Sequence, residues 1–354
     1  MDYEARIAKV GSALPEHKVD ALLVTSPTNV RYLTGFSGTN GQVLVSPGRA
    51  TFFTDPRYRA RASDIVVGAD IAIYSDKLPE VLPEHFSGRV LGVEGQNMTL
   101  AQHAGLEDAL DDVTIEATRN VVEDLRRTKE PAEIELIRQA VVIGDETFSW
   151  VLERLRPGAT EKEIALDLEM RLRTSGADGV SFDPIVGSGP LSAHIHHTPS
   201  DRSLEVGDLV LLDFGCVVDG YCSDLTRTVV LGAATEDQRR IYSTVLEAQT
   251  RGIEAVAVSA SGPEVDAAAR AVIDAAGHAD DFGHGLGHGV GLEVHEAPRL
   301  HRSSDHSLMA GDVVTIEPGI YVSGMGIRIE DCVLVGDDGA EVLGRAPKDR
   351  LMEV

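Results

Sequence analysis

Long apolar runs, cysteine and positive charge are all scarce in this sequence of 354 residues. No run of about 18 apolar residues occurs, so no membrane-spanning helix is expected. The three cysteines, Cys216, Cys222 and Cys332, form no CxxC pair, which argues against a disulfide framework and a thiolate zinc site. Residues 1–4 are acidic and no apolar run follows them, so we expect no signal peptide and a cytoplasmic location.

The charge balance excludes several kinds of partner. Lysine and arginine together number 32 against 57 aspartates and glutamates, which gives a net charge of −25. Such a surface repels phosphates, so a nucleic-acid-binding role and docking on anionic membranes are not expected. The composition, 43% hydrophobic and 25% charged, is otherwise typical of a folded globular protein, and the length suggests two domains.

The first part of the chain, residues 1–122, alternates strand-like and helix-like segments and predicts an α/β domain. Pro47-Gly48 is a turn signal between two apolar runs, and Thr99 is a good helix cap. The expected elements are strands at Val19–Thr25, Gln42–Ser46, Ala50–Thr54 and Val90–Val93 and a helix at 100–110.

The remainder, residues 123–354, predicts a second domain built from two similar halves. Each half has a long helix, a second helix that begins with a capping box, and a β-rich segment. The halves are residues 131–232 and 236–345, with helices expected at 131–155, 160–176, 235–258 and 261–277. Sites often lie between such halves, so matching polar residues in the two β-rich segments are candidates.

The first β-rich segment predicts a hairpin that brings two aspartates together. Asp213 interrupts the apolar run 209–217, and Asp224 lies in the returning strand. A turn at Val218-Asp219 places Asp213 opposite Asp224, whereas a turn at Asp219-Gly220 places Asp213 opposite Thr226 with Asp224 diagonal to it. In both cases the carboxylates share one face, with Cβ atoms about 5 Å or about 7–8 Å apart.

The second β-rich segment repeats the arrangement with glutamates. A two-residue turn at Ser323-Gly324 places Glu317 opposite Glu330. Opposed like charges repel and are costly to bury, so a cation must accompany them. Pairing with Arg227 and Arg328, or exposure to solvent, would explain one such pair; two pairs within apolar strands favour two divalent metal ions with oxygen ligands.

Histidine is the usual nitrogen ligand beside such carboxylates. Residues 283–291, GHGLGHGVG, have glycine at every second position, which disfavours a helix and lets the backbone approach a site closely. His284 and His288 lie in this run and His295 follows it, while His196 lies in a second histidine-rich segment. His194, His197, His278, His301 and His306 are expected at the surface.

Five segments of the second domain follow one another in a recognisable order: Asp213-Phe214-Gly215, Ser223–Thr228, Gly285–Glu296, Glu317–Tyr321 and Gly326–Asp331. Together they resemble the prolidase and aminopeptidase P family of metallopeptidases, and Asn29–Phe36 is similar to the family's N-terminal domain. The resemblance implies an α/β N-terminal domain followed by an α+β catalytic domain of the pita-bread (creatinase/aminopeptidase-like) fold.

The resemblance also implies roles for individual residues. Two divalent metals, Mn²⁺ or Co²⁺ with Zn²⁺ as an alternative, are expected on Asp213, Asp224, His288, Glu317 and Glu330, with Asp224 and Glu330 bridging. Glu317 is the expected general base, and His196, His284 and His295 are expected to act in catalysis. Arg328, Tyr321 and His295 are expected on the substrate side. One departure is His194-Ile195 before His196, where the family often has Leu-Pro.

The implied reaction is metal-dependent hydrolysis of Xaa-Pro bonds in short peptides, as in an Xaa-Pro dipeptidase, by a homodimeric enzyme. An aminopeptidase P acting on longer peptides is the main alternative. A metal-free amidinohydrolase similar to creatinase and a non-catalytic binding protein are less favoured, because all five ligand positions are filled. A methionine aminopeptidase is disfavoured by the additional N-terminal domain.

Overall fold

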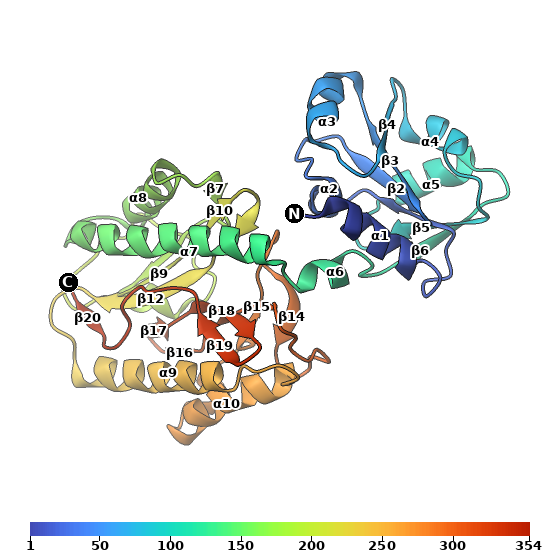
Figure 1. The fold of residues 1–354 in the computed structure, drawn as a ribbon. Helices are drawn as coiled ribbons and strands as arrows, with labels where there is room; N and C mark the ends of the chain where they lie inside the picture. Colours follow the sequence, from blue (N-terminus) through green and yellow to red (C-terminus); the bar gives the residue numbers. More distant parts are fainter. The chain divides into compact units, whose positions relative to one another are not determined.

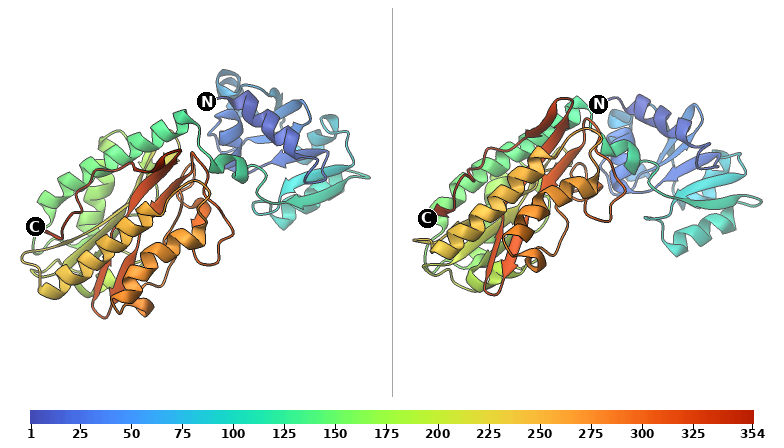
Figure 2. Two further views of the ribbon diagram at one scale, coloured as in Figure 1. Left: turned by 60° about the horizontal axis from the view of Figure 1, so that its bottom comes forward. Right: turned by 90° about the horizontal axis from the view of Figure 1, so that it is seen from below.

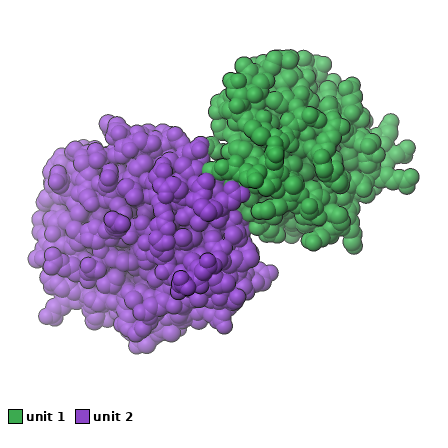
Figure 3. All heavy atoms as spheres, in the orientation of Figure 1, with its two compact units in different colours: residues 1–126 green, residues 127–354 purple.

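The computed structural model describes residues 1–354, which divide into two compact units, 1–126 and 127–354 (Figure 3). Each unit has its own sheets and apolar core, and the residues of interest belong to the second. No helix in the chain combines the length and the apolar character that crossing a membrane requires.

The first unit is a six-stranded sheet with helices packed on it, in the strand order β4-β3-β2-β1-β5-β6. The expected hairpin around Pro47-Gly48 is confirmed, because Ser46 pairs with Arg49. Thr99 caps its helix as expected, with a complete capping box to Gln102. The strands are β1 (Ala21–Val24), β2 (Gln42–Ser46), β3 (Arg49–Thr54), β4 (Asp70–Ile73), β5 (Val90–Glu94) and β6 (Thr114–Thr118), and the helices are α1 (Tyr3–Ala13), α2 (Pro27–Thr34), α3 (Arg59–Ile65), α4 (Leu78–Val81), α5 (Leu100–Ala109) and α6 (Glu123–Arg127), the last of which reaches the division between the units.

The second unit contains the two halves expected from the sequence. In each half a long helix and a shorter one lie on the outside of the strands (Figures 1 and 2). The helices are α7 (Pro131–Val151) and α8 (Glu161–Thr174) in the first half and α9 (Glu236–Glu254) and α10 (Gly262–Ala275) in the second. Thr160, Thr235 and Ser261 each begin a helix with a capping box, as predicted.

The strands of this unit form separate short sheets between the helices. The four-stranded sheet has the order β20-β12-β9-β8 and the five-stranded sheet the order β14-β13-β15-β18-β19. Bounds are β7 (Gly179–Val180), β8 (Ile185–Ser188), β9 (Leu209–Phe214), β10 (Cys216–Val218), β11 (Tyr221–Cys222), β12 (Leu225–Val230), β13 (Gly287–Gly289), β14 (Glu296–Leu300), β15 (Val313–Ile316), β16 (Gly319–Val322), β17 (Met325–Arg328), β18 (Asp331–Gly336), β19 (Gly339–Val342) and β20 (Met352–Glu353).

The predicted end of the second long helix is wrong by a few residues. α9 ends at Glu254 instead of continuing to Val258. Val256 turns into the apolar core, and Ser259 adopts a left-handed conformation with φ of 70° while its N–H donates to the carbonyl of Leu308. This backbone reversal is incompatible with a continued helix.

The two predicted hairpins form with defined registers. The first turn lies at Asp219-Gly220, because Val218 pairs with Tyr221, and Asp213 is therefore opposite Thr226. Of the two alternatives, the diagonal arrangement of Asp213 and Asp224 is the one observed. In the second hairpin Ile316 pairs with Asp331 and Gly319 with Arg328, the register that sets Glu317 against Glu330.

Candidate active site

A cavity of about 570 Å³ lies within the second unit and collects acidic and histidine side chains from both halves. All five residues expected to bind metal line it, together with His196, His284, His295 and Arg328. The expected residues are therefore brought together, although they come from strands and loops more than a hundred residues apart. Of the expected site residues, only Tyr321 is not part of the lining, and it contacts two residues that are.

Three of the five expected ligands form the tightest group. Ligand atoms of Asp224, His288 and Glu330 all lie within 4.8 Å of one another, and all three residues are buried. His288 Nε2 lies 3.7 Å from Asp224 Oδ2 and 3.3 Å from Glu317 Oε1. The fourth and fifth groups, Glu317 and Asp213, extend this cluster along the cavity wall.

Two threonines orient the glutamates. Thr226 Oγ1 donates to Glu330 Oε2 at 2.6 Å, and Thr315 Oγ1 donates to Glu317 Oε1 at 3.2 Å. Thr226 was named from the sequence only as a possible partner of Asp213 across the hairpin, and its bond to Glu330 spans the two halves. Hydrogen bonds of this kind fix which oxygen of a carboxylate faces a ligand.

The alternating glycines allow the strand that carries His288 to approach its neighbours, as the sequence indicated. A Cβ atom at Gly287 would overlap the carbonyl of Thr315, and one at Gly289 would overlap that of Ala297. Gly283, at the start of the run, has nothing within 4 Å of that position. The close approach is thus a property of the part of the run that forms β13.

Arginine accompanies only part of the acidic cluster. Arg227 does not reach the cavity acids: its Nη2 donates to Asp331 Oδ1 at 2.6 Å, and its Nη1 donates to the carbonyl of Glu330. Arg328 does reach them, and its Nη2 donates to Asp213 Oδ2. Pairing with arginine therefore accounts for one oxygen of Asp213, whereas Asp224 and Glu330 have no arginine partner.

Burial and mutual repulsion raise the pKa of three of the acids. Burial is the larger cause for Asp213, Asp224 and Glu330, and neighbouring carboxylates add to it. The pKa values of Asp224 and Glu330 rise well above the ordinary values of these residues. A bound cation would favour the ionised forms of these three carboxylates.

Glu317 and His288 instead stabilise each other's charged forms. Burial raises the pKa of Glu317, but the hydrogen bond and charge of His288 outweigh it and lower the value to about 2. Burial lowers the pKa of His288, but Glu317 and Asp224 outweigh it and raise the value to about 9. Glu317 therefore carries a negative charge at neutral pH.

The donor set fits divalent metal ions. Asp213 Oδ1 is buried and has no hydrogen-bond partner, which is costly for a carboxylate oxygen unless something else contacts it. Four carboxylates balance the charge of two divalent cations, and oxygen donors with one imidazole suit hard or borderline ions such as Mn²⁺, Co²⁺ or Zn²⁺. The residues that could hold such ions are Asp213, Asp224, His288, Glu317 and Glu330.

A chain of hydrogen bonds links Arg328, Tyr321 and His284. Arg328 Nη1 donates to the Tyr321 hydroxyl at 2.8 Å, and His284 Nε2 lies 3.0 Å from the same oxygen. His284 Nδ1 lies 2.8 Å from the carbonyl of Gly285 and must donate to it, so in a neutral ring Nε2 accepts from Tyr321. Burial lowers the pKa of His284, consistent with this neutral form.

The other two histidines differ in how they are held. The ring of His295 packs edge-on against that of His288, with centroids 4.3 Å apart, and burial and the charge of His288 lower the pKa of His295. His196 is exposed at the cavity wall, and its side chain makes no hydrogen bond.

Sequence reasoning misplaced two histidines and missed several wall residues. His197 and His278 are not surface residues, since their side chains are 10% and 13% exposed and bonded to Glu161 and Asp281. His301 lines the cavity. Phe182, Asp183, Ile185, Ile195 and Arg299 also line it. Apart from Ile195, which precedes His196 in the histidine-rich segment, these wall residues lie outside the segments whose spacing signals a site, because a wall residue needs only the right place in the fold.

The fold and the matches to family models define a metal-dependent peptidase. Residues 135–337 match the model of metallopeptidase family M24, and residues 6–128 match that of the creatinase/prolidase N-terminal domain. The chain belongs to metallopeptidase family M24, and its second unit has the expected pita-bread fold.

Relatives match along the whole chain. The Xaa-Pro dipeptidase of Pyrococcus furiosus is 35% identical over 98% of this chain and 99% of its own length. The solved structure of an Xaa-Pro dipeptidase from Bacillus anthracis is 39% identical, with a TM-score of 0.97 over 99% of this chain and 100% of that one. The X-Pro aminopeptidase of Thermotoga maritima is 34% identical, with a TM-score of 0.89 over 95% and 98%.

Proposed function

We propose that this protein is a dinuclear-metal Xaa-Pro dipeptidase, which hydrolyses the bond between an amino acid and a carboxy-terminal proline. The observation that carries the proposal is the convergence on one cavity of three buried carboxylates, the partly buried Glu317 and His288. Relatives named as Xaa-Pro dipeptidases, similar over nearly the whole chain, support the same substrate class.

We propose that Asp213, Asp224, His288, Glu317 and Glu330 would hold two divalent ions, and the family resemblance implies that Asp224 and Glu330 would be shared between them. The oxygen-rich set favours Mn²⁺ or Co²⁺, with Zn²⁺ as the alternative. When bound, two such ions supply an activated water and polarise the scissile carbonyl.

Glu317 is the group that we propose moves the proton. Glu317 is ionised at neutral pH and can therefore accept a proton, and it lines the cavity where the water would be held. The departing prolyl nitrogen has no N–H and must be protonated, so the proton that Glu317 accepts has a defined destination.

We propose that the surrounding histidines and Arg328 orient the substrate and stabilise the negative charge that develops on it. We assign oxyanion stabilisation to His295, because both ring nitrogens of His284 are engaged by Gly285 and Tyr321. His196 is a second candidate for contact with substrate. Arg328 uses three of its five N–H groups on Thr226, Tyr321 and Asp213, so a substrate carboxylate would meet the remaining two.

The proposal has two further parts, the oligomeric state of the protein and its location in the cell. We propose a homodimer from the family resemblance, and a cytoplasmic location for a protein of this class. Sedimentation of the purified protein tests the first, and fractionation of the producing cells tests the second.

The test is an assay of metal-depleted protein on Gly-Pro, Ala-Pro and Ala-Pro-Ala, with Mn²⁺, Co²⁺ or Zn²⁺ restored separately. We expect no cleavage without metal and cleavage of the two dipeptides after restoration. Cleavage of Ala-Pro-Ala in preference to the dipeptides would support an aminopeptidase instead, the activity named for the Thermotoga maritima relative. Undiminished activity after complete metal removal would contradict the proposal.

A further inference from the structure

We propose that Glu161 and His197 are positioning residues that set the place of His196 in the cavity. The inference rests on the proposed function, because it concerns a histidine offered there as a contact for the substrate. Neither residue lines the cavity, so neither is expected to touch substrate or metal.

Glu161 is a fully buried carboxylate at the first position of α8 that uses both oxygens. Oε1 accepts from the N–H and the hydroxyl of Ser188, at 2.8 and 2.6 Å. Oε2 accepts from His197 Nε2 at 2.8 Å and from the N–H and hydroxyl of Ser200, at 2.9 and 2.6 Å. The five bonds compensate for burial, and the pKa of Glu161 is lowered because these donors outweigh desolvation.

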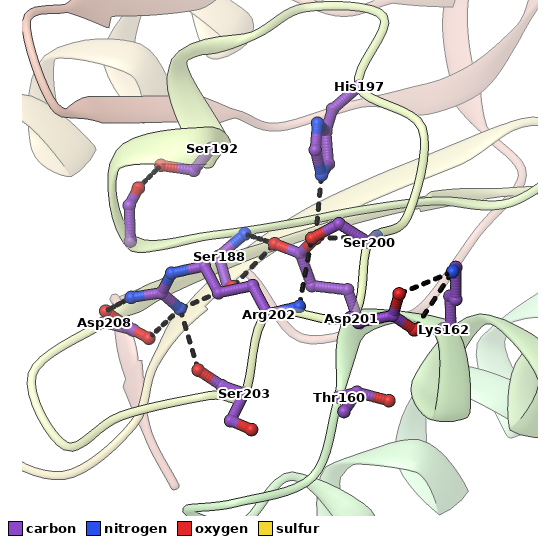
Figure 4. A network of polar contacts seen from close by, with 12 residues as sticks. Thr160, Lys162, Ser188, Ser192, His197, Ser200, Asp201, Arg202, Ser203 and Asp208 are labelled. Atoms are coloured by element: carbon purple, nitrogen blue, oxygen red, sulfur yellow. Dashed lines mark hydrogen bonds and ion pairs between the residues drawn. The ribbon is translucent and has the colours of Figure 1, made fainter.

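These partners of Glu161 lie at the two ends of one segment, residues 189–200. Ser188 ends strand β8 immediately before the segment, and His197 and Ser200 lie near its end; Figure 4 shows all three converging on one point. Arg202 extends the network, with Nη1 donating to Ser188 Oγ at 2.7 Å and to Asp208 Oδ2 at 2.6 Å. The carboxylate of Glu161 therefore links the two ends of the segment.

The middle of the segment is held against a strand of the opposite half. Ser192 Oγ donates to the carbonyl of Gly189 and accepts from the N–H of Gly326 in β17 at 2.9 Å. A Cβ atom at Gly326 would overlap the carbonyl of Ser192, so the two backbones are in close contact. The segment is thus fixed at its start, middle and end.

Residues 193–196 lie between the anchors at Ser192 and His197, and two of them, Ile195 and His196, line the cavity. The side chain of His196 makes no hydrogen bond of its own, so its place is decided by the backbone that carries it. The neighbouring His197 does not line the cavity and is instead bonded to Glu161. Loss of that anchor would let His196 move without altering any proposed metal ligand, and small displacements of a group that meets the substrate cost large factors in rate.

The experiment combines kinetics with hydrogen exchange on the metal-loaded full-length enzyme. His196→Ala first establishes which parameter, kcat or KM for Gly-Pro, depends on this histidine. Glu161→Gln must then change the same parameter, by roughly tenfold or more. A double variant combines Glu161→Gln with His196→Ala. In it, Glu161→Gln must change that kinetic parameter little further, because its effect is expected to act through His196, whose side chain is already absent.

Two matched variants separate positioning from general damage to the fold. Glu163→Gln removes an acid from the same first turn of α8, but Glu163 bonds only to Thr160 and is expected to leave kinetics unchanged. His197→Gln retains an N–H that can donate to Glu161, so it should preserve more activity than His197→Ala.

Hydrogen exchange tests the proposal independently of activity. Peptides covering 189–200 should exchange faster in Glu161→Gln than in the parent or in Glu163→Gln, while metal content stays the same. Unchanged exchange in this segment, or multiplicative losses in the double variant, would overturn the proposal. If the parent enzyme fails to cleave Gly-Pro, the proposed function fails, and the exchange result still decides whether Glu161 holds the segment.

Discussion

At the scale of single residues, the cavity acids differ according to the partner that each one has. Asp213 is held by Arg328, Glu317 by His288 and Thr315, and Glu330 by Thr226. Asp224 has only His288, at 3.7 Å, and shares with Glu330 a strongly raised pKa. The two acids whose pKa values rise well above the ordinary range are therefore the two that we propose as shared ligands.

Glu317→Gln should abolish turnover of Gly-Pro, because the amide cannot accept a proton and is a poorer ligand. General-base contributions of about 10²–10⁴-fold set the scale of the loss in kcat. The measurement is kcat together with metal content. Glu341→Gln, at an exposed acid paired with Arg138, is the control and should behave as the parent. Near-normal turnover of Glu317→Gln would exclude this residue as the base.

Thr226→Val should weaken the metal site without disrupting the core, because it removes one hydroxyl from a buried side chain of the same shape. That hydroxyl donates to Glu330 and accepts from Arg328 Nε at 3.1 Å. Loss of such an orienting bond costs about 10–100-fold in metal affinity or activity. Titration of the apoprotein with Mn²⁺ measures the effect.

Thr228→Val is the matched control for this change. Thr228 lies two residues further along β12, is equally buried, and bonds only to the backbone of Arg328. It should lower stability with little change in metal affinity. Equal losses of affinity in both variants would show that Thr226 acts only through packing.

At the scale of elements, the strand that carries His288 depends on glycine for its approach to β14 and β15. Gly287→Ala should lower the free energy of unfolding by about 1–3 kcal/mol, the usual cost of overpacking, because the new Cβ meets the Thr315 carbonyl. Gly283→Ala should be nearly neutral, since nothing lies within 4 Å. Denaturant midpoints measure both, and equal effects would contradict the close-approach argument.

The start of α8 predicts a pH dependence of stability. Because the pKa of Glu161 is lower in the folded protein than the ordinary value of 4.5, its ionised form contributes stability above that pH. This contribution is lost as the pH falls through the folded value, where the carboxylate is protonated. The difference in unfolding free energy between parent and Glu161→Gln should therefore be large at neutral pH and shrink below about pH 4.5. A difference that grows in acid would contradict the argument.

At the scale of the whole molecule, local patterns predicted much of the fold. Capping boxes at Thr160, Thr235 and Ser261 indicated three helix starts, because a cap is a local interaction three residues long. Turn residues gave the register of the second hairpin and reduced that of the first to two alternatives. The end of α9 was misplaced, because the reversal there depends on Leu308.

The five proposed metal ligands were accessible to sequence reasoning because each interrupts an apolar strand or lies in a glycine-rich run. The pairing of Glu161 with His197 was not, because their bond joins residues 36 positions apart and no local pattern connects the two. The same holds for Arg299 and Asp183, which line the cavity only because of where the fold places them.

The most direct test of the central claim is a crystal structure of the protein grown with Mn²⁺, with anomalous data collected. We predict two neighbouring anomalous peaks in the cavity, contacted by Asp213, Asp224, His288, Glu317 and Glu330, with Asp224 and Glu330 touching both. Peaks elsewhere, or a cavity in which these carboxylates contact only arginine and water, would contradict the account.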